Sequence, residues 1–424
     1  MLLFANAAQV VTCAGPPRAR RGPELADCGV ITAAAVVTDR EHVVEVGAQQ
    51  ELERKYPNAD RVDCARRVLM PGLVDSHTHA IFGRPRYDEQ EMRAAGADYM
   101  EIARRGGGIH ASVRDLRARS EEELYVLAAS RLDRLAAFGT TTVEVKSGYG
   151  LTVDDELKML RVARRLADAL PLRIVPTFLG AHEIPLEARS APAGRADYVR
   201  LLVSDMIPRV AAEGLAQFVD VFCEPGVFTV EESRSILSAA RQAGLRLKLH
   251  ADELRPSGGA ELAAQLGATS ADHLAAISHD GIRALAASET VATLLPGTML
   301  FLGKDRQAPA RALIEAGVAV ALATDFNPGT SPTTNFPLIL TLAVSQLRMS
   351  VAETILAATV NGAAALGIAD RVGQFAPGYS ADLALFDIED VRELPYWYGD
   401  RRCHATWVRG RPCHVTTEAQ GARP

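Results

Sequence analysis

Residues 71–79 read Pro-Gly-Leu-Val-Asp-Ser-His-Thr-His, a short apolar run that ends in two histidines two positions apart. A β-strand sends alternate side chains to the same side, so both imidazoles of this stretch face one way. Two neutral imidazoles on one side can chelate a single metal ion. The simpler alternative is a pair of hydrogen-bonded histidines at the end of a strand. We therefore treat His77 and His79 as candidate metal ligands whose partners lie elsewhere in the chain.

Seven further short apolar runs follow this stretch, separated by longer segments with helical periodicity. Strands that alternate with helices are typical of βα units around a parallel sheet. Eight strands predict a closed (β/α)8 TIM-like barrel within the α/β class. The predicted strands are 72–79, 140–146, 172–180, 217–223, 245–250, 268–273, 290–295 and 318–325, and the clearest predicted helices are 121–138, 154–169, 198–213, 230–243 and 308–316.

The two ends of the chain have a different character, because they carry short β-branched runs without long helices between them. The first thirteen residues are apolar but lack the basic start of a signal peptide, and we interpret them as a first β-strand. Near the other end, Arg409-Gly410 separates two apolar runs and predicts a hairpin. We expect residues 1–68 and 367–424 to form one small antiparallel β-sandwich domain, with the barrel at 69–366.

Composition excludes several classes of protein. The chain has 424 residues, of which 48% are hydrophobic and 23% charged, with a net charge of −6. This charge gives no basic field for a nucleic acid, and no run approaches the roughly 20 apolar residues of a membrane span. The six cysteines include no C-x-x-C pair and no dense framework. We expect a protein of the reducing cytoplasm.

Titratable residues stand at the ends of most predicted strands. Barrels of this kind build their active sites at the carboxyl ends of the strands. A rim of histidines would otherwise need hydrogen bonds or solvent, so the pattern favours an enzyme. The residues in question are His77, His79, Lys146, His182, Glu224, His250, His273 and Asp325.

Four of these side chains form a plausible metal site. His250 ends the fifth predicted strand and Asp325 the eighth, so they can join His77 and His79 in a set of three nitrogens and one oxygen that leaves a position for water. Singly, His250 and Asp325 could be a core histidine and a helix cap. Asp325, Glu253 and His273 are the candidates for moving protons; a solvated loop acid and a buried structural histidine are the simpler readings of the last two.

Two other motifs receive simpler interpretations. Lys146 at a barrel mouth could be carbamylated to bridge two metals, but we favour an ordinary amine packed near the site. The run 106–108, Gly-Gly-Gly, lacks both the Lys-Ser/Thr and the preceding strand of a phosphate loop. A flexible or close-packed turn is the better prediction there.

Several longer motifs resemble those of the imidazolonepropionases, a family within the amidohydrolase superfamily. They are residues 71–79, 106–109, 146–151 (Lys-Ser-Gly-Tyr-Gly-Leu), 250–253 (His-Ala-Asp-Glu), 270–274 and 324–331 (Thr-Asp-Phe-Asn-Pro-Gly-Thr-Ser). The resemblance covers essentially the whole chain. The paired histidines mark only the superfamily, whereas Lys-Ser-Gly-Tyr-Gly and Thr-Asp-Phe-Asn-Pro-Gly-Thr are narrower signals.

The resemblance implies hydrolysis of 4-imidazolone-5-propanoate to N-formimino-L-glutamate in histidine degradation, one zinc or iron ion on the four ligands, and a homodimer. Arg86 could hold the propionate tail by a charge-assisted pair, although its sequence context alone favours a solvated surface arginine. The implied substrate shell is Arg86, Tyr99, Tyr149, His182, Glu253, Asn327, Gly329 and Thr330. Ser76 and Arg84-Pro85 depart from the residues usual in the family, but neither supplies a proposed ligand.

Two other functions remain open at this point. A related amidohydrolase that acts on another cyclic amide, or that deaminates a nucleobase-like ring, would share the metal ligands but need no partner for a carboxylate tail. A non-catalytic barrel would be expected to have lost ligands, and all four are present. The residues do not choose between zinc and iron, and they leave open which of Glu253, His273 and Asp325 gives the leaving nitrogen its proton.

Overall fold

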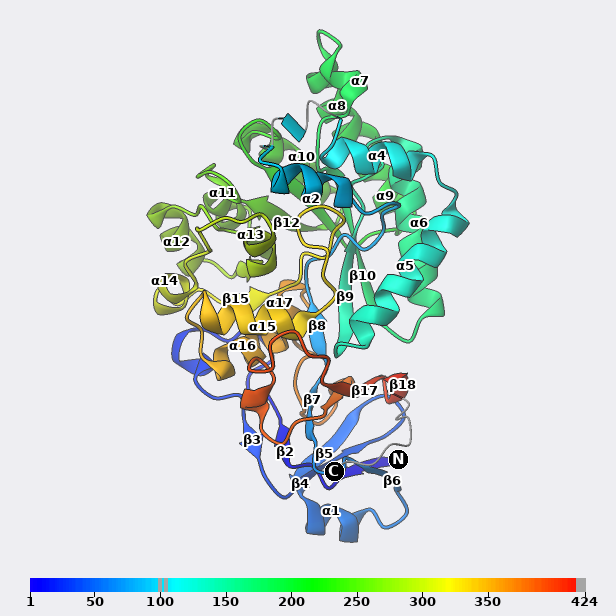
Figure 1. Ribbon diagram of the computed structural model, residues 1–424, viewed down its shortest axis with the longest axis vertical. Coiled ribbons are helices and arrows are strands. Elements are labelled where there is room, and N and C mark those ends of the chain that lie inside the picture. The colour runs from blue at the N-terminus through cyan, green and yellow to red at the C-terminus, as the bar shows by residue number, and fades with distance from the viewer. Residues whose placement is uncertain (98–100, 103–105, 417–424) are drawn as a thin grey trace.

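The computed structural model describes residues 1–97, 101–102 and 106–416. Its strands form an eight-stranded sheet and two smaller sheets of four and six strands. Figure 1 shows the eight-stranded sheet, ringed by helices, in the upper part of the molecule and the two smaller sheets together below it. The predicted combination of a barrel and a smaller β unit is confirmed.

The eight strands of the large sheet follow one another in chain order, and every pair within it is parallel. Each coincides with a predicted strand to within a few residues, and β9 coincides with its prediction at both ends. The strands are β8 Leu73–Asp75, β9 Thr140–Lys146, β10 Arg173–Ala181, β11 Phe218–Cys223, β12 Arg246–Ala251, β13 Ser270–His273, β14 Val291–Leu294 and β15 Val320–Leu322.

The barrel closes through a seam between β8 and β15, which do not pair as regular strands. Beyond the end of β8, His77 O accepts a hydrogen bond from Asp325 N at 3.1 Å, and His79 N donates to Phe326 O at 2.8 Å. Asp75 accepts from Thr324 N and Oγ1 at 3.0 and 2.6 Å. The first and last predicted strands were therefore too long: their carboxyl ends are seam segments, bent where Asp325 takes a φ of +52°.

The five predicted helices are confirmed, and the sequence explains where they begin. Ser120, Thr229 and Thr152 accept hydrogen bonds from the third residue of α5, α10 and α6, which satisfies one free N–H of each first turn. The one difference is the predicted helix 198–213, which is α8 and α9 joined by a π-helical turn at Leu202–Met206. The first four predicted helices correspond to α5 Glu121–Ala136, to α6 Val153–Ala169, to the pair α8 Gly194–Leu201 and α9 Ile207–Ala212, and to α10 Val230–Gln242.

The remaining helices have ten residues or fewer and lie mostly in the loops that follow the strands. Two of them, α16 and α17, pack against β15 and help fill the wall beside the seam. These helices are α2 Tyr87–Ala94, α4 Ile109–Arg117, α7 Leu186–Arg189, α11 Gly259–Gln265, α12 His279–Ala286, α13 Pro296–Phe301, α14 Ala310–Glu315, α15 Phe336–Ser345, α16 Val351–Ala357 and α17 Val360–Ala365.

The two smaller sheets combine both ends of the chain, as predicted. The six-stranded sheet runs β18-β17-β16-β7-β2-β3, and the four-stranded sheet runs β5-β4-β1-β6. Their strands are β1 Leu2–Ala5, β2 Gln9–Val11, β3 Val30–Ile31, β4 Ala34–Thr38, β5 Val43–Ala48, β6 Asp60–Asp63, β7 Val68–Pro71, β16 Leu383–Phe386, β17 Cys403–Val408 and β18 Arg411–Val415, with helix α1 at Gln49–Lys55.

Two details of this unit differ from the prediction. The first thirteen residues form two strands in different sheets, because the chain turns at Asn6 with a φ of +60°. The sheets are also mixed, since β1 pairs with β6, and β2 with β7, in parallel. The predicted hairpin is confirmed: Arg409 and Gly410 both take positive φ and join β17 to β18. The exact limits of the domains stay a prediction.

Two whole-chain expectations can be compared with the described residues. No helix among them is long and apolar enough to cross a membrane. All six cysteines are free thiols, and five of them are buried. Burial raises the pKa of Cys13 to about 12, so this thiol stays protonated and packs as a small apolar side chain.

Candidate metal centre and substrate site

Five histidines gather at the carboxyl-terminal mouth of the barrel. The His77 ring lies 4.5 Å from that of His250 and 5.3 Å from those of His79 and His273, measured between centroids. His182 stacks on His79 at 5.1 Å with an interplanar angle of 18°. All five are buried. The structure therefore brings together the histidines that stand far apart in the sequence.

Asp325 completes the group from the other side of the seam. Its Oδ2 accepts a hydrogen bond from Thr298 Oγ1 at 2.6 Å. Its Oδ1 faces the histidines, 3.6 Å from His77 Nε2 and 3.5 Å from His79 Nε2. Thr298 thus fixes the carboxylate so that one oxygen remains for the imidazole nitrogens.

These separations suit a shared cation. Two ligand atoms that each lie about 2.1 Å from a tetrahedral zinc are about 3.4 Å apart, close to the two distances to Asp325 Oδ1. The Nε2 atoms of His77 and His250 are buried without a hydrogen-bond partner among the described residues. Buried polar atoms without partners are costly, so the donor atoms fit a metal ion that would satisfy them.

Two overlapping groups of potential ligand atoms share His77. One is His77, His79 and Asp325; the other is His77, His250 and His273; within each group the atoms lie within 4.8 Å of one another. The four predicted ligands therefore meet at one place. His273, which was predicted to shuttle protons, also lies within ligand distance of His77 and His250.

Burial gives four of the histidines, His77, His79, His182 and His273, the protonation state that a metal needs. Desolvation, reinforced by the neighbouring imidazoles and Lys146, holds the pKa of His77, His79 and His273 well below the usual range. Burial likewise lowers the pKa of His182 to about 3. His182 Nδ1 lies 3.0 Å from Gly148 O and therefore donates to it, which leaves Nε2 as a free acceptor. Neutral imidazoles coordinate metals without first losing a proton.

Glu253 lies beside His273, and the solvated-acid reading of its sequence context is wrong. Its side chain is buried, and its Oε2 lies 3.7 Å from His273 Nδ1. Burial, together with Asp325 and Glu224, raises the pKa of Glu253 to about 8. The loop is held by Glu224, which accepts from the backbone N–H groups of Glu253, Leu254 and Arg255. Glu253 is thus a fixed carboxyl group that holds a proton near neutral pH.

Arg86 is also buried, so the surface reading of this residue is wrong. Only 8% of its side chain is exposed, and its Nε and Nη1 atoms have no hydrogen-bond partner among the described residues. Glu89 Oε1 lies 3.5 Å from Nε. The guanidinium packs against Gly329, where an added Cβ would lie 1.4 Å from Nη2. Only glycine leaves room for the arginine at this position.

The loops after β15 and β9 supply further residues of the predicted shell. Asn327 Oδ1 accepts from Gly329 N and Thr330 N at 2.9 and 2.7 Å, which folds the loop into a tight turn beside Arg86. Tyr149 is buried, with its ring 5.4 Å from that of His182. Tyr99 lies outside the described residues. Apart from Glu253, which lies beside His273, the other predicted shell residues thus fall into two neighbouring groups, one around Arg86 and Gly329 and one around His182 and Tyr149.

The glycine run 106–108 is a close-packed turn, as predicted. Gly108 N donates to Glu89 Oε1 at 2.6 Å, and an added Cβ on Gly107 would lie 2.6 Å from the Ile102 side chain. The run therefore connects the loop that carries Arg86 to the start of α4. Its role in the described structure is packing.

The sequence interpretation missed a set of buried charges below the imidazoles. Asp272 Oδ2 lies 2.7 Å from His77 Nδ1, and Asp220 Oδ2 lies 2.9 Å from His250 Nδ1. Glu144, Lys146 and Lys248 surround these two carboxylates. Lys146 ends β9 and was expected to pack near the site, whereas the other four lie inside strands and were missed because the prediction considered mainly strand ends. Charged residues at alternate positions of otherwise apolar strands were the available signal.

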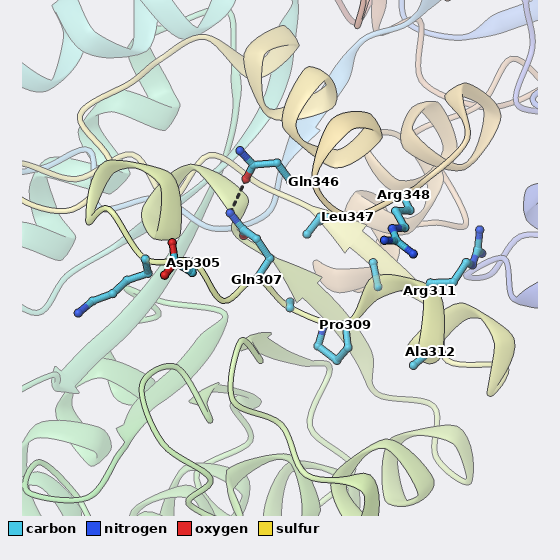
Figure 2. A pocket seen from close by; sticks show the side chains of 11 residues that line it. Asp305, Gln307, Pro309, Arg311, Ala312, Gln346, Leu347 and Arg348 are labelled. Atoms are coloured by element: carbon cyan, nitrogen blue, oxygen red, sulfur yellow. Dashed lines mark hydrogen bonds between the residues drawn. The ribbon is translucent and has the colours of Figure 1, made fainter.

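A separate hollow opens on the outside of the barrel, and Figure 2 shows it between the start of α14 and the end of α15. Its volume is about 610 Å³, and Arg311, Arg348 and Gln307 are among the residues that line it. Gln307 Nε2 donates to Gln346 Oε1 at 2.5 Å across it. None of the predicted site residues in the described part of the chain lines this hollow, so we place the candidate site at the histidine cluster.

Comparison with known sequences agrees with this geometry. The amidohydrolase family profile matches residues 68–413. The imidazolonepropionase of Geobacillus kaustophilus is 46% identical over 403 residues, which cover 94% of either chain. That of Symbiobacterium thermophilum is 48% identical over 402 residues, covering 94% of this chain and 93% of the other. The chain belongs to the imidazolonepropionase family of amidohydrolases.

Solved structures place the imidazolonepropionase fold among other amidohydrolases. Escherichia coli guanine deaminase matches with a TM-score of 0.74 and 17% identity, over 98% of this chain and 100% of that one. An adenosine deaminase from Xanthomonas campestris with bound zinc matches with a TM-score of 0.69 and 20% identity, over 98% and 93%. At these identities the likeness concerns the fold. In this imidazolonepropionase-family chain the His and Asp groups described above could bind the metal on which amidohydrolases depend.

Proposed function

We propose that the protein hydrolyses 4-imidazolone-5-propanoate to N-formimino-L-glutamate, with His77, His79, His250 and Asp325 holding one metal ion. Family membership supports the reaction. The buried side chain of Arg86, next to the histidine cluster, is the observation that supports this substrate. Because the substrate has a propionate tail, its binding requires a cation with hydrogen-bond donors left free, and the Glu89 carboxylate, 3.5 Å from Arg86 Nε, does not take up these donors. Arg86 meets this requirement with its two unpartnered nitrogen atoms.

When bound, a divalent ion activates water and polarises the ring carbonyl. The water oxygen adds to the carbonyl carbon while its proton passes to Asp325, the ring C–N bond breaks, and the leaving nitrogen takes a proton from Glu253, which the proton held by Asp325 then replaces. Glu253 is suited to this transfer, because its raised pKa lets it hold the proton near neutral pH and give it up at the nitrogen. His273, 3.7 Å from Glu253, orients that carboxyl.

The substrate ring would lie between the two neighbouring groups of shell residues. Arg86 pairs with the propionate by a charge-assisted contact, and the turn at Asn327 and Gly329 holds the guanidinium in place. His182 offers its free Nε2 as an acceptor for a ring N–H. Tyr149 and the imidazoles exclude water from the other side.

The test is steady-state kinetics with 4-imidazolone-5-propanoate for the wild type and for Arg86→Ala. We expect wild-type turnover, and a KM for the variant that rises on the order of 10- to 100-fold, because a charge-assisted pair contributes about 1.5–3 kcal/mol. The metal content should not change.

Arg84→Ala is the matched control, because Arg84 lies on the same loop but pairs with Asp88 at the surface. It should leave KM unchanged. Equal KM values for Arg86→Ala and the wild type would refute the proposal that Arg86 binds the propionate tail. A wild-type enzyme that turns over a nucleobase ring and not the imidazolone would instead support the deaminase alternative.

Metal identity, assembly and location complete the proposal. The donor set of three nitrogens and one oxygen suits either zinc or iron, and elemental analysis of protein purified without added metal decides between them. We also propose a homodimer located in the cytoplasm. Sedimentation analysis tests the dimer, and cell fractionation tests the location.

A further inference from the structure

Beneath the imidazoles lies a layer of five charged residues that the proposed reaction does not use: Glu144, Lys146, Asp220, Lys248 and Asp272. Each side chain is fully buried. They come from four strands of the barrel: the adjacent strands β11, β12 and β13, and β9, which β10 separates from β11. We call this set the charge layer. Three carboxylates and two ammonium groups give it a net charge of −1.

Lys146 lies at the centre of the layer. Its Nζ is 2.7 Å from Asp220 Oδ2, 2.8 Å from Glu144 Oε2 and 3.8 Å from Asp272 Oδ2. Burial disfavours its charged form, but the three carboxylates outweigh burial and raise the pKa of Lys146 above its ordinary value. A carbamate on this nitrogen would put a further negative charge among three carboxylates, so the surroundings favour an ammonium group.

Lys248 ties the layer to the seam of the barrel. Its Nζ donates to Ser76 O at 2.8 Å, one residue before His77. It also lies 3.3 Å from Glu144 Oε1 and 3.6 Å from Asp272 Oδ2. Lys248 therefore holds the backbone of the segment that carries His77 and His79.

Two carboxylates of the layer reach upward to imidazoles. Asp272 Oδ2 is 2.7 Å from His77 Nδ1, and Asp220 Oδ2 is 2.9 Å from His250 Nδ1. A carboxylate accepts a hydrogen bond from an N–H group, so Asp272 holds the hydrogen of His77 on Nδ1 and leaves Nε2 as a lone pair. Asp220 lies close to His250 Nδ1 without an aligned hydrogen bond, and its negative charge favours the same tautomer there. Both Nε2 atoms lack a hydrogen-bond partner among the described residues. The layer thus favours the metal-binding tautomer of both histidines.

Five buried charges are expensive in free energy, and apolar side chains of similar volume would often be as stabilising or more so. This cost is explained if the charge layer organises the metal ligands above it. Its net negative charge favours a cation there, and its contacts fix two ligand rings before any ion arrives. Lys146 is the member that contacts both orienting carboxylates.

Resting on the metal site proposed above, we propose that Lys146 is a positioning residue. It holds Asp220 and Asp272, and these carboxylates orient His250 and His77 so that their Nε2 atoms face the metal. The role lies outside the reaction itself, because Lys146 reaches the imidazoles only through these carboxylates. Its loss should therefore alter the affinity and geometry of the metal site directly.

The experiment compares metal-free wild type with Lys146→Met and Asp272→Asn. Zinc affinity is measured by competition with a chromophoric chelator, and coordination geometry by the visible spectrum of the cobalt-substituted protein. We expect each variant to bind zinc about 10- to 100-fold more weakly and to shift the cobalt absorption bands. Folding is checked by circular dichroism; should Lys146→Met not fold, Asp272→Asn decides, since it preserves the shape of the side chain.

Arg173→Met is the matched control. It removes a partly buried ion pair with Asp382, 3.2 Å long, at the amino-terminal end of β10. It should leave zinc affinity and the cobalt spectrum unchanged. Folded variants with wild-type affinity and spectrum would overturn the role of Lys146 alone. A wild type that binds no metal would instead overturn the metal site of the proposed function.

Discussion

The barrel mouth and the paired small sheets bury side chains equally well but with opposite chemistry. Between the small sheets the core is apolar, and its Phe4 and Trp407 rings meet edge to face at 5.1 Å. At the mouth the buried groups are imidazoles, carboxylates and ammonium ions, several without hydrogen-bond partners in the described chain. Apolar burial stabilises a fold, whereas unsatisfied polar burial costs stability and is kept where it serves chemistry. Substitutions in the two regions should therefore have separable effects.

The largest effect is expected for Asp325→Asn at the mouth. An amide is a weaker ligand than a carboxylate, and the proton-accepting group is lost as well, so kcat/KM should fall on the order of 10³-fold or more. Metal content measured by elemental analysis should fall with it. Burial raises the pKa of Asp325 to about 6, so the melting temperature of the metal-free variant at pH 7 should be equal or higher.

Asp305→Asn provides the matching control, because Asp305 is an exposed carboxylate at the outer hollow. It should keep wild-type kinetics and metal content. Full metal occupancy in Asp325→Asn would contradict its place among the ligands.

The complementary change is Phe4→Ala in the small sheets. Removing this fully buried ring should lower the free energy of unfolding by about 3–5 kcal/mol. Zinc affinity measured on the folded variant should stay within a factor of about two, because Phe4 shares no contact with the mouth and distant sites act independently. A large loss of zinc affinity with only slight destabilisation would break the proposed separation between the two regions.

The smallest effect is a pH dependence that Glu253 contributes to stability. Its pKa is about 8 in the folded protein and near 4.5 when unperturbed. Below pH 4.5 the carboxyl is protonated in both states and burial costs little. Between pH 4.5 and 8 the unfolded chain releases the proton while the folded protein keeps it, so stability declines. The free energy of unfolding of metal-free Glu253→Gln should therefore increase relative to that of the wild type by a few kcal/mol as pH rises through this window.

Thermal melting of the two metal-free proteins from pH 4.5 to 8.5 measures this difference. Glu231→Gln, an exposed glutamate in the first turn of α10, is the control and should track the wild type. A constant gap between Glu253→Gln and wild type over the whole range would show that Glu253 ionises normally.

The parts of the molecule that could be predicted are those encoded by local periodicity. The βα alternation predicted the barrel, and the spacing of His77 and His79 placed both at the same mouth. Arg409-Gly410 predicted its hairpin because it contains a glycine and separates two apolar runs, and both residues take positive φ in the turn. In each case neighbouring residues in the sequence carry the whole signal.

The parts that could not be predicted depend on residues distant in the sequence. Arg86 is buried only because the loop at Gly329 folds over its guanidinium. Asp272 becomes a partner of His77 across 195 positions of sequence, and it lies within a strand. Nor did the strand patterns indicate that β8 and β15 would stop short of pairing.

That last feature has a mechanical meaning. Two neighbouring backbone hydrogen bonds join the ends of the first and last strands of the barrel. They involve His77, His79 and Asp325, three of the four residues proposed to hold the cation. A metal ion that holds those side chains together therefore also stabilises the closure of the barrel. Without the metal ion, the seam between β8 and β15 would be the first part of the barrel to open. Amide hydrogen exchange at residues 77–79 and 325–326 would detect this opening first.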